Sequence, residues 1–266
     1  MSVPLQRQTV RHVEQQRLVY YRQSADVTYW QQHWQQRVKL PTPDQTAAVL
    51  RDFNGVFQRW LPHEGRILEA GCGNGRILIT LRYLGYPIEG VEWVVDTVRA
   101  TRASYPDLPI RVADVTRLDV LDTAFDAYIS LGVVEHRRAG PEPFLTEAYR
   151  VLRPAGIMLI SVPYFNPLRR FKVLFGSYRT NPAGLEFYQY AFRPAEFNAL
   201  LQQSGFQMLE HVPISSLKGL REELSVVRWM ASKPRLRGPL NALLERWQWS
   251  KQVAGHMMLY VCRKTE

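Results

Sequence analysis

The chain has 266 residues, of which 46% are hydrophobic and 22% are charged, and its formal charge is +10 at pH 7. Its length allows one large domain with additions and a sizeable core. Two cysteines exclude a disulfide-rich secreted scaffold, and no residues cluster with metal-ligand spacing, so we expect no metal site. No apolar run reaches the roughly 20 residues that span a bilayer, and the polar N-terminus is unlike a signal peptide. We therefore expect a cytoplasmic protein.

Residues 1–45 differ in composition from the rest of the chain. They are rich in glutamine and end in a proline-containing stretch. Their aromatic side chains are Tyr20, Tyr21, Tyr29, Trp30 and Trp34. We interpret this pattern as a pair of helices, and we expect residues 46–266 to form the main domain.

The segment ILEAGCGNGR, residues 67–76, is the most informative motif in the chain. An apolar strand leads to Glu69, a glycine turn follows, and a helical run begins at once. The turn residues are Gly71, Cys72, Gly73 and Gly75. Glycine has no Cβ, so a ligand can lie directly against the main chain, and the helix start offers unpaired N–H groups. This order predicts the nucleotide-like site that α/β folds build after their first strand.

The glycine spacing disfavours a dinucleotide as the ligand. A dinucleotide fingerprint reads G-x-G-x-x-G, whereas here the third glycine, Gly75, comes one residue early and Arg76 takes the later position. A carboxylate at Glu69 would also repel a pyrophosphate and would attract a cationic amino group. The ligand that this turn predicts is therefore cationic and free of phosphate.

Further acidic and glycine positions follow at the ends of later apolar runs. The run IEGVE ends in Glu92, about 20 residues past the turn, where a carboxylate can accept hydrogen bonds from ribose hydroxyls. Trp93 follows it. The next run leads to Asp114 and Val115, and FDAYISLGVVEH passes through Leu131 and Gly132. Strands and helices alternate as far as residue 163, which predicts a mainly parallel sheet.

In order and spacing, residues 65–163 resemble the class I S-adenosylmethionine-dependent methyltransferases. The resemblance implies a Rossmann-like, doubly wound α/β fold. Its sheet would have seven strands, mostly parallel, with an antiparallel last strand. It also implies S-adenosylmethionine as the cofactor, because this molecule carries an α-amino group and a sulfonium but no phosphate.

The same resemblance assigns roles to the strand ends. Glu69 and the glycine turn would hold the cofactor, Trp93 would pack on its adenine, and Asp114 would lie near the exocyclic amine of that ring. Val115, Leu131 and Gly132 would complete the site. The N-terminal helical segment would act as a cap over the cofactor.

Methyl transfer requires the acceptor to be aligned with the donor, and a base only where the acceptor must lose a proton. His136 is the first candidate base, because the ordinary histidine pKa suits proton transfer near neutral pH. A structural histidine bonded to a loop carbonyl is the alternative. Tyr164 is a candidate for orienting the acceptor, with packing in the core as its alternative. The segment LGVVEH lacks the Asn/Asp-Pro-Pro-aromatic motif of amide and adenine methylases.

Two insertions interrupt the resemblance. Residues 163–193 are rich in phenylalanine and tyrosine, which predicts an aromatic lid on the acceptor side. The basic side chains there, which would catch an anionic group, are Arg169, Arg170, Lys172 and Arg179. Residues 215–252 predict two amphipathic helices joined by the turn KPRLRGP. Their apolar faces pack on the domain, or serve as a dimer contact or a peripheral contact with an anionic membrane.

The leading hypothesis is therefore a methyltransferase acting on oxygen or carbon of a small-molecule or lipid-linked acceptor that is amphipathic or anionic. The strand segment before His136 is similar to that of quinone-biosynthesis methyltransferases. The basic insertions leave an RNA methyltransferase as an alternative, although no RNA-binding module is recognisable and nucleic acid is a disfavoured partner. A cofactor-binding but catalytically silent scaffold subunit is the alternative from another class.

Overall fold

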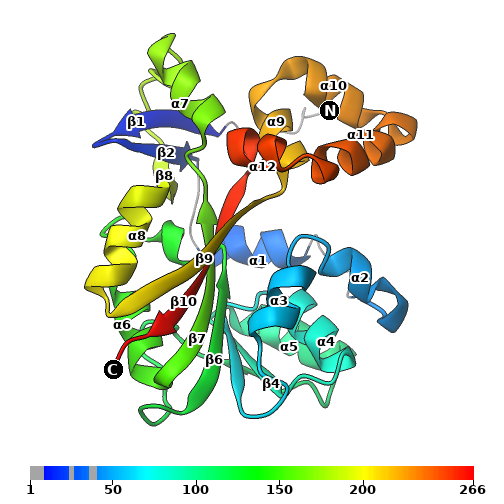
Figure 1. Ribbon diagram of the computed structural model, residues 1–266, viewed down its shortest axis with the longest axis vertical. Coiled ribbons are helices and arrows are strands. Elements are labelled where there is room, and N and C mark those ends of the chain that lie inside the picture. The colour runs from blue at the N-terminus through cyan, green and yellow to red at the C-terminus, as the bar shows by residue number, and fades with distance from the viewer. Residues whose placement is uncertain (1–8, 24–26, 36–40) are drawn as a thin grey trace.

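The computed structural model describes residues 9–23, 27–35 and 41–266. A seven-stranded sheet runs through its centre in the order β5-β4-β3-β6-β7-β10-β9 (Figure 1). Its strands are β3 (Ile67–Ala70), β4 (Ile88–Glu92), β5 (Ile110–Val112), β6 (Phe125–Leu131), β7 (Leu152–Pro163), β9 (Phe206–Ile214) and β10 (Met257–Lys264).

The strands from β5 to β7 pair in parallel, and β10 is antiparallel to both of its neighbours. The predicted sheet, with its antiparallel last strand, is confirmed. Along the chain, β3 comes first, and β4 and β5 are added on one side of it. The strands β6 and β7 are then added on the other side of β3. Such a reversal opens a crevice at the carboxyl ends of the central strands.

Helices cover both faces of this sheet (Figure 1). On one face lie α3 (Asn54–Trp60), α4 (Arg76–Tyr83) and α5 (Val95–Ser104), preceded by the short η1 (Pro43–Gln45) and α2 (Thr46–Val49). On the other lie α6 (Glu142–Val151) and α8 (Pro194–Gln203). Neighbouring strand residues serve opposite faces: Ile67 belongs to the core under α4, and Leu68 to the core under α6. This is why the central strands read as continuous apolar runs.

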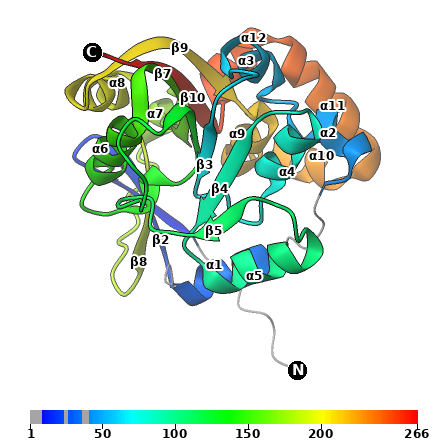
Figure 2. The ribbon, with the colours of Figure 1, turned by 90° about the horizontal axis from the view of Figure 1, so that it is seen from below.

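The N-terminal segment is not a pair of helices, and that prediction is wrong for residues 10–22. They form a hairpin of β1 (Val10–Glu14) and β2 (Arg17–Arg22), which pairs with β8 (Glu186–Ala191) in a separate three-stranded sheet. The hairpin turns at Gln15 and Gln16, whose φ angles are 45° and 70°. Such turns usually carry Asn-Gly, so residues 15 and 16 lack the residue types that would predict a hairpin. The helix α1 (Val27–Gln35) does form, and it lies against α5 (Figure 2).

The two insertions also differ in part from their predicted form. Residues 163–193 supply α7 (Pro167–Leu174) and β8. Residues 215–252 fold into four helices rather than two: α9 (Ser216–Glu223), α10 (Ser225–Ser232), α11 (Pro234–Arg246) and α12 (Gln248–Ala254). The expected turn KPRLRGP is wrong, because most of it lies inside α11. Pro234 opens that helix, where its missing N–H costs nothing, and Leu244 packs into a small core with Leu217 and Ala231.

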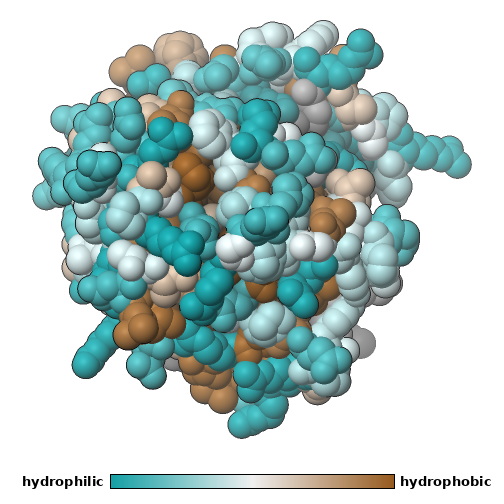
Figure 3. Space-filling view, turned by 60° about the horizontal axis from the view of Figure 1, so that its bottom comes forward, coloured by the Kyte–Doolittle hydropathy of each residue, from teal (hydrophilic) through white to brown (hydrophobic). Residues whose placement is uncertain are grey.

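Among the described residues, no helix has both the length and the apolarity to cross a bilayer. The surface seen in Figure 3 is mostly hydrophilic, with apolar side chains in separate small groups.

Candidate active site

Four predicted site positions lie together at the carboxyl edge of the central sheet. Glu69 is the residue before the last in β3, Glu92 ends β4, Asp114 follows β5, and Gly132 follows β6. Because parallel strands point their carboxyl ends the same way, their end residues share one edge of the sheet. The topology therefore brings the sequence motifs to one place.

The glycine turn is held to the strand beside it by its own backbone. The N–H groups of Gly71 and Cys72 both donate to the carbonyl of Val91, each at 2.9 Å. Gly73 has a φ of +55°, and a Cβ there would lie 2.5 Å from the indole of Trp34 on α1. Glycine is required at this position both by conformation and by space. The same contact shows that α1 covers the turn.

Glu92 joins the end of β4 to this turn. Its carboxylate is buried, with Oε2 accepting from the Gly73 N–H at 2.9 Å and Oε1 accepting from the Val94 N–H at 3.0 Å. Burial raises the pKa of Glu92, and the backbone N–H donors oppose that rise. Each carboxylate oxygen has further lone pairs, so Glu92 can still accept from a ligand hydroxyl.

Glu69 has a different environment. It is only 4% exposed, and its Oε2 has no hydrogen-bond partner among the described residues. Burial raises the pKa of Glu69 to about 8, Glu92 adds to the rise, and a backbone hydrogen bond from Leu78 opposes it. A buried carboxyl without a cation is costly when ionised. The arrangement therefore favours a ligand that brings a positive charge.

The remaining predicted cofactor residues border this edge with different exposures. Trp93 is 49% exposed, Val115 is buried, and Leu131 is partly buried. Asp114 is exposed, and its Oδ1 accepts from both the N–H and the hydroxyl of Thr116 at 2.8 Å. These bonds fix the direction of Asp114 while leaving its other oxygen for a ligand. Whether each residue touches a cofactor stays a prediction.

His136 lies in the short helix η2 (Val134–His136), under an aromatic group from α1 and β8. Its ring centroid is 4.7 Å from that of Trp30 and 4.9 Å from that of Tyr188. Nδ1 lies 2.8 Å from the Tyr188 carbonyl, which can only accept, so Nδ1 carries the proton of the neutral ring. Burial lowers the pKa of His136 to about 4. The ring is therefore neutral near pH 7, with Nε2 as its acceptor nitrogen.

Glu135 is a site residue that the sequence analysis did not select. It is 2% exposed, its Oε2 has no partner among the described residues, and its Oε1 is 3.8 Å from His136 Nε2. Burial raises the pKa of Glu135 to about 8. The sequence shows Glu135 next to His136, but only the fold reveals that Glu135 is buried and His136 partly buried at the same edge.

Tyr164 is placed differently from His136. Its hydroxyl donates to the Gln252 carbonyl of α12 at 3.1 Å, and its ring belongs to the core under α6 and α8. These contacts favour a structural role, and its role in orienting an acceptor stays a prediction.

Two of the basic side chains expected to catch an anion are already paired. Arg169 is fully buried and bonds Glu222 at 2.8 Å and Glu223 at 3.1 Å, and Lys172 bonds Glu223 at 2.9 Å. The expectation is therefore wrong for Arg169 and Lys172. Arg170 and Arg179 are exposed.

Comparison with known proteins relates this edge to one family. The family described as "Methyltransferase domain" matches residues 68–160, which include β3, β4, β5, β6 and most of β7. The chain is 31% identical over 170 residues to a probable S-adenosylmethionine-dependent methyltransferase of Mycolicibacterium smegmatis. That match covers 63% of this chain and 62% of the relative, so the chain spans about three fifths of the relative's length.

A second relative and a solved structure extend the comparison. The chain is 28% identical over 173 residues to the ubiquinone biosynthesis O-methyltransferase of Dinoroseobacter shibae, covering 62% of this chain and 69% of the relative. A chain from a solved Haloferax volcanii complex that contains a methyltransferase activator superposes with a TM-score of 0.62 at 18% identity. It covers 91% of this chain and 98% of its own length. This structural likeness supports the fold alone.

Proposed function

Because this chain belongs to the class I S-adenosylmethionine-dependent methyltransferases, we propose that it transfers a methyl group from S-adenosylmethionine to a small-molecule or lipid-linked acceptor. The single observation that carries the proposal is Glu69, a buried carboxyl with an unpartnered oxygen beside a glycine turn. That combination fits the α-ammonium of the cofactor and not a pyrophosphate. When bound, S-adenosylmethionine supplies an activated methyl group on a sulfonium.

Different residues at the carboxyl edge would contact different parts of the cofactor. Glu69 would pair with the ammonium group, Glu92 and Asp114 would accept from the adenosyl part, and Trp93 would pack on its ring. The backbone at Gly73 leaves room for the ligand to lie against the main chain. Trp34 on α1 covers the same turn and would exclude water from the bound donor.

The acceptor side is built from His136, Tyr188 and Trp30. Aligning an acceptor against the donor supplies a large part of the rate in such a displacement. Where the acceptor is a hydroxyl or an acidic carbon, its proton would pass to Nε2 of His136, because Nδ1 is held by the Tyr188 carbonyl. Glu135, 3.8 Å away, would stabilise the resulting imidazolium once ionised.

An amphipathic or anionic acceptor, methylated on oxygen or carbon, fits the mixture of aromatic rings and arginines on this side. Arg22 lies over the Tyr188 ring at 4.3 Å, and Arg138 lies over Phe187 at 5.7 Å. Apolar walls with a few cations suit a ring or chain that carries an anionic group. We propose a peripheral contact with an anionic membrane as the partner that a lipid-linked acceptor requires.

Calorimetry with S-adenosylhomocysteine tests the donor site. We expect Gly73→Arg to abolish binding, because its side chain would fill the space beside the turn. The matched control is Gly85→Arg, where φ is also positive, at +84°, but nothing lies within 4 Å of an added Cβ. It should bind like the wild type. Equal binding by Gly73→Arg and the wild type would remove the site assignment.

Turnover tests the acceptor side. Labelled S-adenosylmethionine and cell extract would show whether lipid, RNA or soluble acceptors take up the methyl group. We expect His136→Ala to lower turnover about 100-fold or more with little change in donor affinity. Label found in RNA would mean that the protein is an RNA methyltransferase instead. Tight donor binding without any labelled product would favour a catalytically silent scaffold subunit. Unchanged turnover would make His136 structural.

A further inference from the structure

One end of the molecule exposes large apolar side chains in unusual number. More than half of the large apolar side chains that the described residues expose lie on or beside α7, α10, α11 and α12. The most prominent are Phe171, Leu174, Phe175, Trp229, Trp247 and Trp249, which we call the apical face. Leu174 is 79% exposed, Phe175 is 73%, and Trp229 and Trp249 are each 60%. Exposure of this extent on a monomer indicates an interaction surface.

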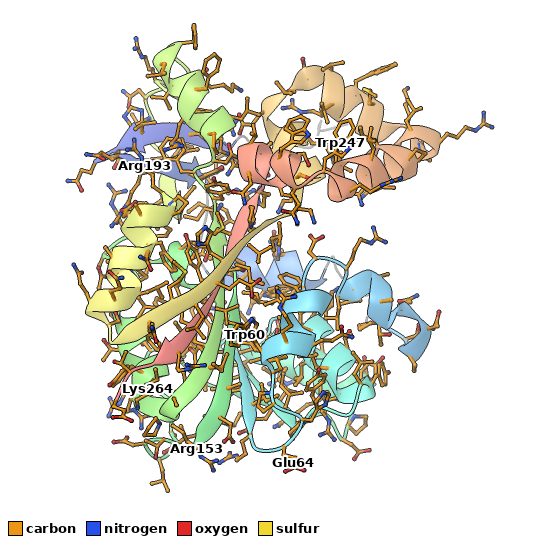
Figure 4. The ribbon with its side chains drawn as sticks, in the orientation of Figure 1. Trp60, Glu64, Arg153, Arg193, Trp247 and Lys264 are labelled. Atoms are coloured by element: carbon orange, nitrogen blue, oxygen red, sulfur yellow. The ribbon has the colours of Figure 1, made fainter. Side chains whose placement is uncertain are left out.

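The apical face joins two insertions that are far apart in the sequence. The helix α12 packs against both α7 and α11, and α11 packs against α10. Figure 1 shows these helices at the same end of the molecule, beyond the carboxyl edge of the sheet. Figure 4 labels Trp247 at this end, with Glu64 and Arg153 at the opposite end.

The charge around the apical face is almost entirely positive. The sequences of α7, α10 and α12 contain no aspartate or glutamate, and α11 contains one glutamate. The exposed cations on and between these helices are Arg170, Arg228, Lys233, Arg235, Arg237 and Arg246. Lys233 Nζ also lies 5.7 Å from the Trp229 ring. Tryptophan, phenylalanine and leucine among basic residues are typical of helices that lie in the interface of an anionic membrane.

A groove on the inner side of α7 fits the same partner. It encloses about 360 Å³ and is lined by Arg170 and Arg193 together with Phe171, Leu174 and Val13. Figure 4 places Arg193 beside β1, next to this groove. Its Nε is buried with no hydrogen-bond partner among the described residues. Two guanidinium groups beside an apolar wall suit a lipid phosphate and the start of its acyl chain.

We propose that the apical face docks on the surface of an anionic lipid bilayer, with a lipid phosphate held between Arg170 and Arg193. Exposed leucine and phenylalanine on α7 offer nothing to an RNA backbone, and a second copy would bring a like-charged surface. A bilayer satisfies the apolar side chains and the cations together. The inference rests on the proposed membrane contact and does not depend on methyl transfer.

Vesicle flotation with the full chain tests this docking. We expect the protein to float with vesicles of mixed phosphatidylcholine and phosphatidylglycerol, and to remain unbound with pure phosphatidylcholine. The double variants Leu174→Ser with Phe175→Ser, and Trp229→Ser with Trp249→Ser, should each bind at least about tenfold more weakly. Arg235→Glu with Arg237→Glu should weaken binding by at least about tenfold as well, because each cation near an anionic surface contributes.

Matched controls separate this surface from general changes. Leu121→Ser removes an 84% exposed leucine far from these helices, and Arg263→Glu reverses an exposed charge on β10. Both should float like the wild type. Equal flotation of the apical variants and these controls would overturn the proposal. It would also be overturned if light scattering showed a wild-type dimer that becomes a monomer in the apical variants. Binding of S-adenosylhomocysteine should be the same in every variant, so a failure of the docking is distinguishable from a failure of the donor site.

Discussion

Two groups of glutamates in this chain have opposite electrostatic surroundings. At the carboxyl edge of the sheet, Glu69 and Glu135 each have an oxygen without a partner among the described residues, and burial raises the pKa of both to about 8. Between the insertions, Glu222 and Glu223 lie among cations. Although burial opposes it, His256 and Arg169 lower the pKa of Glu222 to about 2, and Arg11 lowers that of Glu223.

The two surroundings indicate two different roles. The cluster around Arg169 ties the hairpin, α7 and α9 together, since Arg11, Arg169 and Lys172 all bond Glu223. Its charges are satisfied within the protein, so it holds the insertions in place. The carboxyls at the sheet edge remain uncompensated, and a ligand with a positive charge would satisfy Glu69. Glu223 and Glu69 are therefore buried to a similar extent, yet the first is structural and the second is available for binding.

Glutamate-to-glutamine substitutions test both roles, and we expect the cluster around Arg169 to lose the most stability. Glu223→Gln removes one of the two carboxylate partners of the buried Arg169 together with the partner of Arg11 and Lys172, and breaking a buried ion pair from one side costs about 3–5 kcal/mol. Urea unfolding measures the loss. Glu64→Gln, on an exposed loop, should change the free energy of unfolding by less than about 0.5 kcal/mol. A similarly small loss in Glu223→Gln would mean that the cluster does not hold the insertions.

Glu69→Gln should behave in the opposite way. Because the folded protein keeps this carboxyl neutral near pH 7 while the unfolded chain ionises it, we expect the neutral glutamine to leave the stability there unchanged or to raise it. Affinity for S-adenosylhomocysteine should fall about tenfold to a hundredfold, since a hydrogen bond to a charged group is lost. Calorimetry and urea unfolding on the same preparation give both values. A destabilised variant with normal affinity would reverse the two assignments.

The pH dependence of stability has opposite signs for the two groups of glutamates. Glu69 and Glu135 have a folded pKa of about 8, above the ordinary 4.5, so the stability that they contribute at low pH is lost as the pH rises from about 4.5 to 8. Glu222, with a folded pKa of about 2, contributes stability above 4.5 that is lost as the pH falls toward 2. We expect Glu69→Gln to flatten the decline above pH 5 and leave the acid limb unchanged. Urea unfolding across the pH range would show it.

Donor binding gives a second test of the protonation state of Glu69. If an ammonium group pairs with Glu69, binding near pH 7 should release roughly one proton, because the carboxyl passes from neutral to ionised. Calorimetry in buffers of different ionisation enthalpy counts that proton, and Glu69→Gln should abolish its release. Proton release that survives the substitution would assign it to another group, such as Glu135.

The β3 to β7 part of the fold could be predicted because its signals are local. Apolar runs, the glycine turn and the alternation of strands and helices each act within a few residues, and the parallel sheet follows from their order. The hairpin at residues 10–22 could not be predicted, because Gln15 and Gln16 adopt positive φ angles without the residues that usually mark them. The helix through KPRLRGP was missed because packing of Leu244 with Leu217 and Ala231 outweighs the local turn signals.

Residue types at fixed spacing are enough to predict the central sheet, the glycine turn and the acidic residues that end its strands. Only the tertiary structure decided which charges are satisfied. Arg169 and Glu69 look equally available in the sequence, yet one is fully paired with Glu222 and Glu223 and the other keeps an unpartnered oxygen among the described residues. The physical reason is that desolvation and pairing depend on neighbours brought together from distant parts of the chain.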